Sequence, residues 1–234
     1  MGFFDLPAPA LQAVDAAAAH VANETARIVL WAGLTSALVM ALYRKLSNQK
    51  RIAALKAEIA AGKRDMADID AEDMGAVMAH SRKLLGLSLK QIGASLWPTL
   101  VSGLPVLFVF AFLGNVYSYT APEAGAQIAA TVVHADGLVQ SESLAWPLQD
   151  TRIDSTAVPS GVSASIAPRG WTARLFGNPA GYLNTAAAVE RIDLGLQPKV
   201  FLSFMPDWLS GWEVLFLAVM TSLSLAIKFI FRIE

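Results

Sequence analysis

Three apolar runs separated by polar chain dominate the pattern of hydrophobic positions along this sequence. They cover residues 28–43, 94–114 and 212–231. A helix rises about 1.5 Å per residue and a bilayer core is about 30 Å thick, so a spanning helix needs about 20 apolar residues. The second and third runs have that length. The first either takes in residues from the Ala-rich chain before it or crosses a locally thin membrane. The pattern predicts three transmembrane helices.

The segment 44–93, between the first two runs, has a helical period in place of a continuous apolar run. Apolar side chains recur at helical spacing from Leu46 to Ile59, and a second stripe follows Gly62. Each amphipathic helix needs a partner for its stripe, so we expect an antiparallel hairpin of the coiled-coil type with its turn at Gly62. A solvated linker between two spans is the alternative, because Ala-rich charged segments are often no more than that.

The segment 115–211 consists of short β-type runs separated by turns that contain Gly and Pro, a pattern typical of small β folds. The predicted strands cover residues 127–134, 162–166, 171–176, 191–196 and 199–204. We therefore expect a small, mostly β domain, loosely a sandwich, between the second and third spans. The predicted fold class is an α-helical integral membrane protein with three spans, a helical hairpin and this domain.

Charged residues are segregated along the chain, although the net charge is only −1. Segment 44–93 has ten Lys and Arg against six Asp and Glu, 115–211 has five against eight, and the tail 1–27 has one against three. Cytoplasmic loops of membrane proteins carry an excess of Lys and Arg. We therefore expect 44–93 and the C-terminus 232–234 to be cytoplasmic. The tail and 115–211 are then extracytoplasmic, which gives an N-out, C-in protein of the bacterial inner (plasma) membrane.

The composition limits the kinds of chemistry that this chain can carry out. Hydrophobic residues make up 55% of the chain and charged residues only 16%, against about 25% in soluble domains. There is no cysteine, which excludes disulfides, thiolate metal sites and thiol catalysis. The three histidines lie outside the predicted spans and within no recognisable catalytic motif. We expect no enzymatic activity, no cofactor, no metal site and no nucleic-acid recognition.

The order of segments resembles the Oxa/YidC insertase superfamily. The resemblance rests on the basic run 44–51 directly after the first span, the approach 83–98 to a proline-containing second span, and the stretch 211–228, which ends in Lys228. The branch it resembles most is the three-span one, which includes archaeal YidC-like proteins and the insertase subunit of the eukaryotic ER membrane complex. Order and topology carry this resemblance, which covers the chain outside 115–211.

The resemblance implies a polar groove among the three spans, open to the cytoplasm and to lipid, along which a hydrophobic segment slides. Polar groups are costly in hydrocarbon, so an aqueous groove shortens the apolar path of a translocated tail. Bacterial members keep a positive residue in the groove on the first span, and 28–43 has none. Alternatively, Ser and Thr permit close helix packing and bond their own backbone. The candidate groove residues are Thr35, Ser36, Thr99, Ser102, Thr221, Ser222, Ser224 and Lys228.

The hairpin offers a second candidate surface. Met66, Met74 and Met78 either contact apolar substrates, since thioethers adapt to many shapes, or form the seam of the hairpin itself. The partners implied are the lipid bilayer and hydrophobic segments of membrane proteins or neighbouring subunits of a membrane complex, with the ribosome as a candidate partner of the basic hairpin.

The domain at 115–211 favours a second hypothesis about function, because the corresponding connection in the family is usually short. The chain is then a non-catalytic accessory or scaffold subunit of a larger membrane complex. Such a subunit would hold its partners through apolar and aromatic side chains of this domain. The candidates are Trp146, Trp171, Phe176 and Tyr182.

Overall fold

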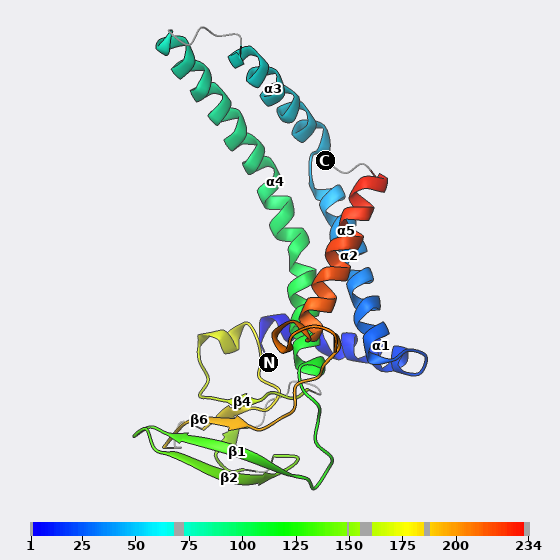
Figure 1. Ribbon diagram of the computed structural model, residues 1–234, viewed down its shortest axis with the longest axis vertical. Coiled ribbons are helices and arrows are strands. Elements are labelled where there is room, and N and C mark those ends of the chain that lie inside the picture. The colour runs from blue at the N-terminus through cyan, green and yellow to red at the C-terminus, as the bar shows by residue number, and fades with distance from the viewer. Residues whose placement is uncertain (1, 68–72, 149, 155–160, 185–187, 232–234) are drawn as a thin grey trace. The chain divides into compact units, whose positions relative to one another are not determined.

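A computed structural model of the chain describes residues 2–67, 73–148, 150–154, 161–184 and 188–231. Its contacts divide it into two compact units, each described by itself below. The sheet unit comprises Met1–Gly33 and Val106–Met220, and the hairpin unit comprises Leu34–Pro105 and Thr221–Glu234. Figure 1 labels the five α-helices and four of the strands.

Among the described residues, three helices are long and apolar enough to cross a membrane, as the sequence predicted. They are α2 (Glu24–Leu46), α4 (Met74–Tyr117) and α5 (Trp212–Phe231). Helix α2 begins four residues before the first apolar run, so it takes in part of the preceding chain and reaches a length of about 35 Å. Helix α4 has 44 residues, about 66 Å, which is more than twice the thickness of a bilayer core.

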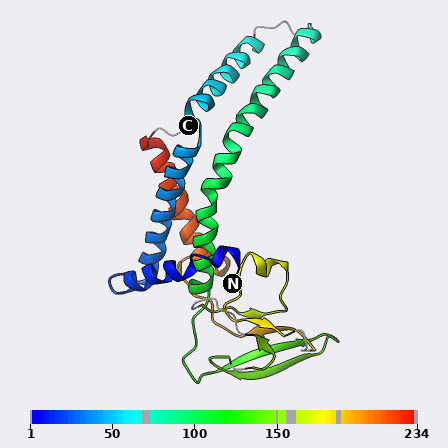
Figure 2. The ribbon, with the colours of Figure 1, turned by 180° about the vertical axis from the view of Figure 1, so that it is seen from behind.

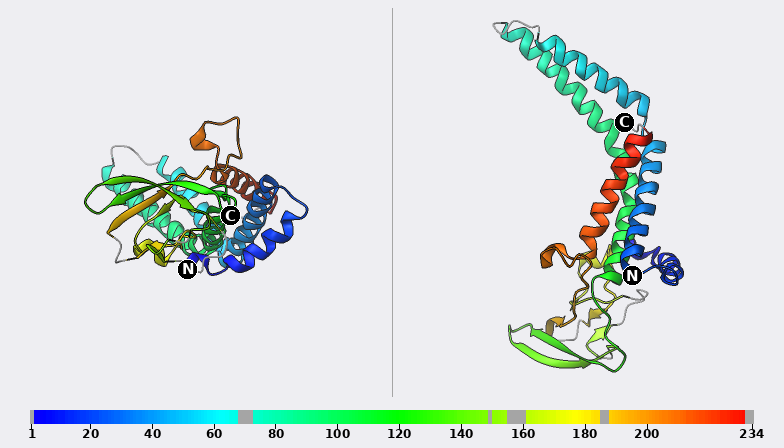
Figure 3. Two further views of the ribbon diagram at one scale, coloured as in Figure 1. Left: turned by 90° about the horizontal axis from the view of Figure 1, so that it is seen from below. Right: turned by 45° about the vertical axis from the view of Figure 1, so that its right-hand side comes forward.

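In the hairpin unit, α3 (Gln49–Ala67) runs alongside the first half of α4 (Figures 1 and 3). Ile52 and Leu55 are buried, so the predicted stripe of the first helix faces inward. The predicted turn at Gly62 is wrong, because α3 continues through Gly62 to Ala67. The chain between the two helices, 68–72, lies outside the described residues.

Gly62 is instead a point of close approach between α3 and α4. A Cβ atom at this position would lie 2.7 Å from Cδ2 of Leu84, closer than carbon atoms pack. The backbone oxygen of Gly62 also lies 2.9 Å from Nε2 of His80 on α4. In the sequence, Gly62 suggests a break in the helix. In the structure, its lack of a side chain allows α4 to pack against α3 at this point.

The sheet unit contains a small antiparallel sheet between α4 and α5, which confirms the predicted β region in its coarse form. The strand order is β2 (Val139–Ala145), β1 (Gln127–His134), β6 (Val189–Leu194) and β4 (Ser165–Ile166). A two-stranded ribbon of β3 (Ile153–Asp154) and β5 (Tyr182–Leu183) shares the same apolar core. Alternate side chains of β1 enter this core, as expected for a strand with one covered face.

Two of the predicted strands are wrong. Residues 171–176 contain a 3-10 helix, η2 (Trp171–Arg174), and 199–204 form no strand. Residues 191–196 are shifted, because β6 begins at Val189, and only Ser165–Ile166 of 162–166 is a strand. The N-terminal tail is also part of this unit. It forms η1 (Phe3–Asp5) and α1 (Ala8–Ala19), and α1 lies crosswise to the start of α2 (Figure 2).

Candidate functional site

Two of the candidate groove hydroxyls meet between α2 and α5. Oγ of Ser36 lies 2.9 Å from Oγ of Ser224, a hydrogen bond between residues 188 positions apart in sequence. Ser36 is fully buried. A pair of small hydroxyl side chains lets two helices approach closely and links them in an apolar surrounding. This contact agrees with the packing role that Ser and Thr play in membrane helices.

Three other candidates line a cavity of about 350 Å³ in the hairpin unit. Thr99 and Ser102 come from α4, and Lys228 comes from α5. On α2 the lining includes Tyr43, a residue that the sequence analysis did not select. The remaining lining residues are Val39, Met40 and Gly103. The cavity therefore combines three hydroxyl groups and one ammonium group on an apolar wall, and no acidic side chain among the described residues lines it.

The hydroxyl hydrogens on the α4 side of the cavity are already used. Oγ1 of Thr99 donates to the backbone oxygen of Ser95 at 2.7 Å, and Oγ of Ser102 donates to that of Thr99 at 3.2 Å. Such bonds to the preceding turn are common in apolar helices. Each oxygen keeps lone pairs, so towards the cavity these side chains present acceptors.

Thr35 is the candidate with an unsatisfied polar group. It is buried, and its Oγ1 has no hydrogen-bond partner among the described residues. A buried hydroxyl without a partner costs about 1–3 kcal/mol. By contrast, Thr221 and Ser222 are exposed on α5, and neither lines the cavity.

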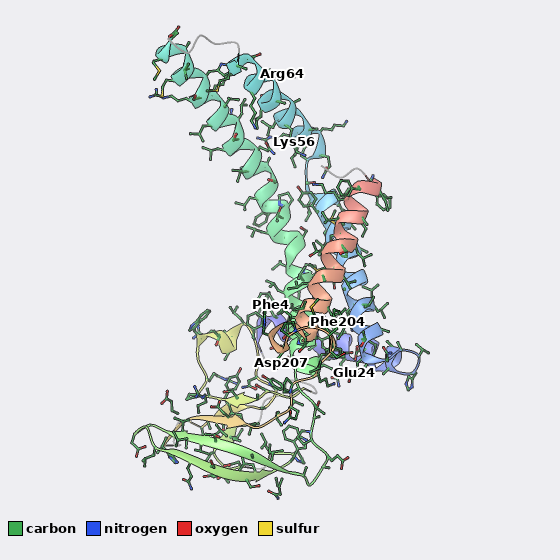
Figure 4. The ribbon with its side chains drawn as sticks, viewed as in Figure 1. Phe4, Glu24, Lys56, Arg64, Phe204 and Asp207 are labelled. Carbon is green, nitrogen blue, oxygen red and sulfur yellow. The ribbon has the colours of Figure 1, made fainter. Side chains whose placement is uncertain are left out.

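The hairpin methionines lie near the end at which α3 stops and α4 begins. Met74 and Met78 are 66% and 52% exposed, whereas Met66 is half-buried. Met74 and Met78 therefore do not form the seam between α3 and α4. Basic side chains of α3, among them Lys56 and Arg64 (labelled in Figure 4), are also exposed on this hairpin.

An exposed apolar stripe on α4 continues from these methionines, and the sequence analysis missed it. Its members recur at intervals of three, four or seven residues, which keeps them on one helix face. The sequence analysis selected only Met74 and Met78 from it, as substrate contacts or as the seam of the hairpin, and the later members were not recognised as one face. The stripe consists of Met74, Met78, Leu85, Leu89, Ile92, Leu96 and Leu100.

The sheet unit holds a buried ionic cluster that sequence reasoning also missed. The carboxylate of Asp15 on α1 accepts hydrogen bonds from Arg27 at 2.6 Å, from Nε1 of Trp31 at 3.0 Å and from the hydroxyl of Tyr117 at 2.7 Å. These donors lie on α2 and α4, so the carboxylate joins three helices. Lys199 forms an ion pair with Glu24 at 2.6 Å nearby. A single Asp within an Ala-rich helix was the available signal.

A second ionic cluster connects β2 with the chain that leads to β3. Arg152 donates to Asp150 at 2.6 Å and to Glu142 at 2.7 Å. Hydrogen bonds from Arg152 lower the pKa of Asp150, although partial burial opposes this. The same bonds raise the pKa of Arg152. This cluster is paired internally and links β2 to the chain before β3.

The geometry of the described residues does not support a metal-binding site. Within the described part of the chain, no three His, Asp or Glu side chains converge on a position that a metal ion could occupy. The cavity of Thr99, Ser102 and Lys228 is the candidate functional site, with Tyr43 as a further lining residue.

Comparison with protein-family models, with curated proteins and with solved structures finds no match to this chain.

Proposed function

We propose that this chain is a membrane protein insertase or chaperone of the Oxa/YidC type, which assists insertion or assembly of membrane proteins through a polar groove. The observation that carries the proposal is the cavity in which hydroxyls of α2 and α4 and the ammonium of Lys228 share an apolar wall. The proposal includes the N-out, C-in orientation in a bacterial inner membrane, for which the segregation of charge is the argument.

The chemistry of the cavity suits a passing polar segment. Hydroxyl acceptors and a cation hold water at a depth where hydrocarbon would otherwise exclude it, which shortens the apolar path of a translocated tail. Bacterial members of the family that the sequence resembles carry a positive residue on the first span. Here Lys228 supplies a positive charge from α5 instead. It would attract acidic residues that flank an incoming hydrophobic segment.

The exposed stripe of α4 fits the same function. Helix α4 is too long for its whole length to lie in hydrocarbon, so part of the stripe lies outside the core of the membrane. An apolar stripe in water binds apolar partners, and flexible thioethers such as those of Met74 and Met78 suit partners of varied shape. In this proposal the hairpin contacts a hydrophobic segment before that segment reaches the groove.

The test is insertion into proteoliposomes that contain the purified full-length chain. A Thr99→Val, Ser102→Ala, Lys228→Leu variant makes the cavity apolar, and we expect it to reduce insertion of a short-tailed substrate roughly tenfold. Thr221→Leu is the matched control, because it also places Leu on α5 but outside the cavity. Insertion would be followed by protease protection of the substrate. Equal insertion by the triple variant and the control would contradict the proposal.

The accessory-subunit function remains the second candidate, and one observation favours it. Trp171 is 75% exposed on η2, and Phe176 is also exposed, as partner-binding aromatic residues would be. Of the other two side chains selected from the sequence, Tyr182 is buried and Trp146 is half-buried. Two results together would favour the accessory function over the insertase function. They are the loss of co-purifying proteins in Trp171→Ala and unchanged insertion in the cavity variant.

A further inference from the structure

A second and larger cavity lies along α2 and α5 in the hairpin unit, with a volume of about 590 Å³. No residue of α4 lines it, so it occupies a different face of α2 from the candidate groove, although Met40 borders both. Its wall is apolar over most of its length, and the described residues place two cations at one end. The lining residues are Ala37, Met40, Ala41, Arg44, Lys45, Ile227 and Phe231.

The two cations are available to a ligand. Arg44 and Lys45 lie in the last turn of α2 and are exposed. Within the described part of the chain, neither forms an ion pair or a hydrogen bond. The guanidinium carbon of Arg44 lies 5.9 Å from the ring centroid of Phe231, a contact that holds it beside the apolar wall. Charge and apolar surface thus meet at one edge of the cavity.

This combination fits an amphiphile with a negatively charged head. A soluble anion would leave the apolar wall unused, and a purely apolar helix would leave both cations without a partner. The cations also lie where the apolar run of α2 ends, which is the depth of lipid headgroups. Basic pockets between membrane helices bind acidic headgroups for the same electrostatic reason.

We propose that this cavity binds an acidic phospholipid. The phosphate group lies at Arg44 and Lys45, and an acyl chain lies along Ala37, Ala41 and Ile227. The site depends on a membrane location of the chain but not on insertase activity. Because its lining differs from that of the groove in every residue but Met40, changes at the two sites separate this proposal from the proposed function.

The experiment uses the full-length protein in detergent and native mass spectrometry. The probes are phosphatidylglycerol and phosphatidylcholine with identical acyl chains. We expect phosphatidylglycerol to bind about tenfold to thirtyfold more tightly, because each cation near an anionic lipid contributes about a fivefold gain. Arg44→Gln together with Lys45→Gln should abolish this preference. Lys50→Gln together with Arg51→Gln is the matched control, since it removes two cations that do not line the cavity.

A third variant tests the apolar wall. Ala41→Phe fills the cavity and should weaken phosphatidylglycerol binding at least about fivefold, and Ala37→Leu serves if the larger side chain prevents folding. Three results would overturn the proposal. They are an unchanged preference in the Arg44/Lys45 variant, an equal loss in the Lys50/Arg51 control, and undiminished binding in a folded wall variant. Competition by glycerol phosphate as effective as that by the lipid would also overturn it, because the site would then recognise a free phosphate.

Discussion

At the scale of single residues, Asp15 shows how an apolar helix tolerates a buried charge. Its carboxylate receives three hydrogen bonds, and one of them comes from a cation. A buried charge with this many partners is compensated. If one member of a buried ion pair is removed, the remaining charge carries its full desolvation cost. Loss of Asp15 would leave the charge of Arg27 poorly paired, because its side chain is mostly buried and its Nε has no hydrogen-bond partner among the described residues.

We therefore predict that Asp15→Ala lowers the free energy of unfolding of the sheet unit by about 3 kcal/mol. This value is at the lower end of the cost of breaking a buried ion pair, because Glu24 remains 3.9 Å from Arg27 and partly compensates its charge. Tyr117→Phe removes one hydrogen bond to the carboxylate and should cost about 1.5 kcal/mol. Thermal unfolding in detergent, followed by circular dichroism, measures both. Asp65→Ala on the exposed face of α3 is the control. If the Asp15 variant unfolds at the same temperature as this control, the cluster does not hold the unit together.

The packing of single residues also explains why the groove could be predicted only in part from the sequence. Helical spacing indicated that Ser224 and Lys228 share a face of α5, but it could not indicate how α5 is rotated about its own axis. That rotation depends on side-chain packing, which pairs Ser224 with Ser36 and leaves Thr221 exposed. Tyr43 was missed for a related reason. An aromatic residue near the end of an apolar run is typical of the membrane interface, and nothing in its spacing indicates a cavity.

At the scale of elements, the hairpin shows that a glycine within a helical pattern has two opposite interpretations. It can break the helix, or it can admit a neighbouring helix. The flanking sequence does not choose between them, because both halves of 49–67 have good helix formers. The packing of Leu84 and His80 over Gly62 decides in favour of a continuous helix.

This register can be tested in a chain that has no native cysteine. We expect Gly62→Cys with Leu84→Cys to form a disulfide on mild oxidation, because a Cβ atom at position 62 would lie against the side chain of Leu84 across the hairpin. Gly62→Cys with Leu85→Cys is the control, since Leu85 faces away and is exposed. Proteolysis between the helices and mass spectrometry would detect the cross-link. Equal cross-linking in both variants would mean that α3 and α4 are not packed in this register.

The strands show where sequence patterns succeed and fail. β1 was predicted with its observed bounds, because Ile128, Ala130 and Val132 alternate with outward-facing residues. β2 was missed, because it lies at the edge of the sheet and is mostly polar, with Leu144 packed against the core. The turn before it was nevertheless visible as the pair Asp136 and Gly137, and Gly137 has a φ of 84°. An Asp-Gly pair is a strong hairpin signal, so it indicates a strand on each side even where one of the strands is polar.

At the scale of the whole molecule, composition predicts a membrane protein and the distribution of charge predicts its orientation. The three apolar runs are so unlike the rest of the chain that their number was predictable. Their orientation remains a prediction, because it depends on the membrane and on the machinery that inserts the chain.

Single cysteines test this orientation with a membrane-impermeant thiol reagent in intact cells. We expect Ser141→Cys on β2 to be labelled, and Ala57→Cys on α3 to be labelled only after the membrane is permeabilised. Both positions are exposed, so access depends on the side of the membrane and not on burial. The unmodified chain has no cysteine and provides the blank. Labelling of Ala57→Cys but not of Ser141→Cys in intact cells would reverse the topology.

The slight burial of α5 also bears on the order in which the chain assembles. Only 6% of its most apolar stretch is buried within the chain, against 28% in α2 and 33% in α4. In a bilayer, such a helix is stable through its own backbone bonds and surrounding lipid before it meets another helix. We therefore expect α5 to enter the membrane as an independent unit. The bond between Ser36 and Ser224 then forms in a later, lateral step, so the maturation of this protein resembles the pairing of separate helices more than the collapse of one chain.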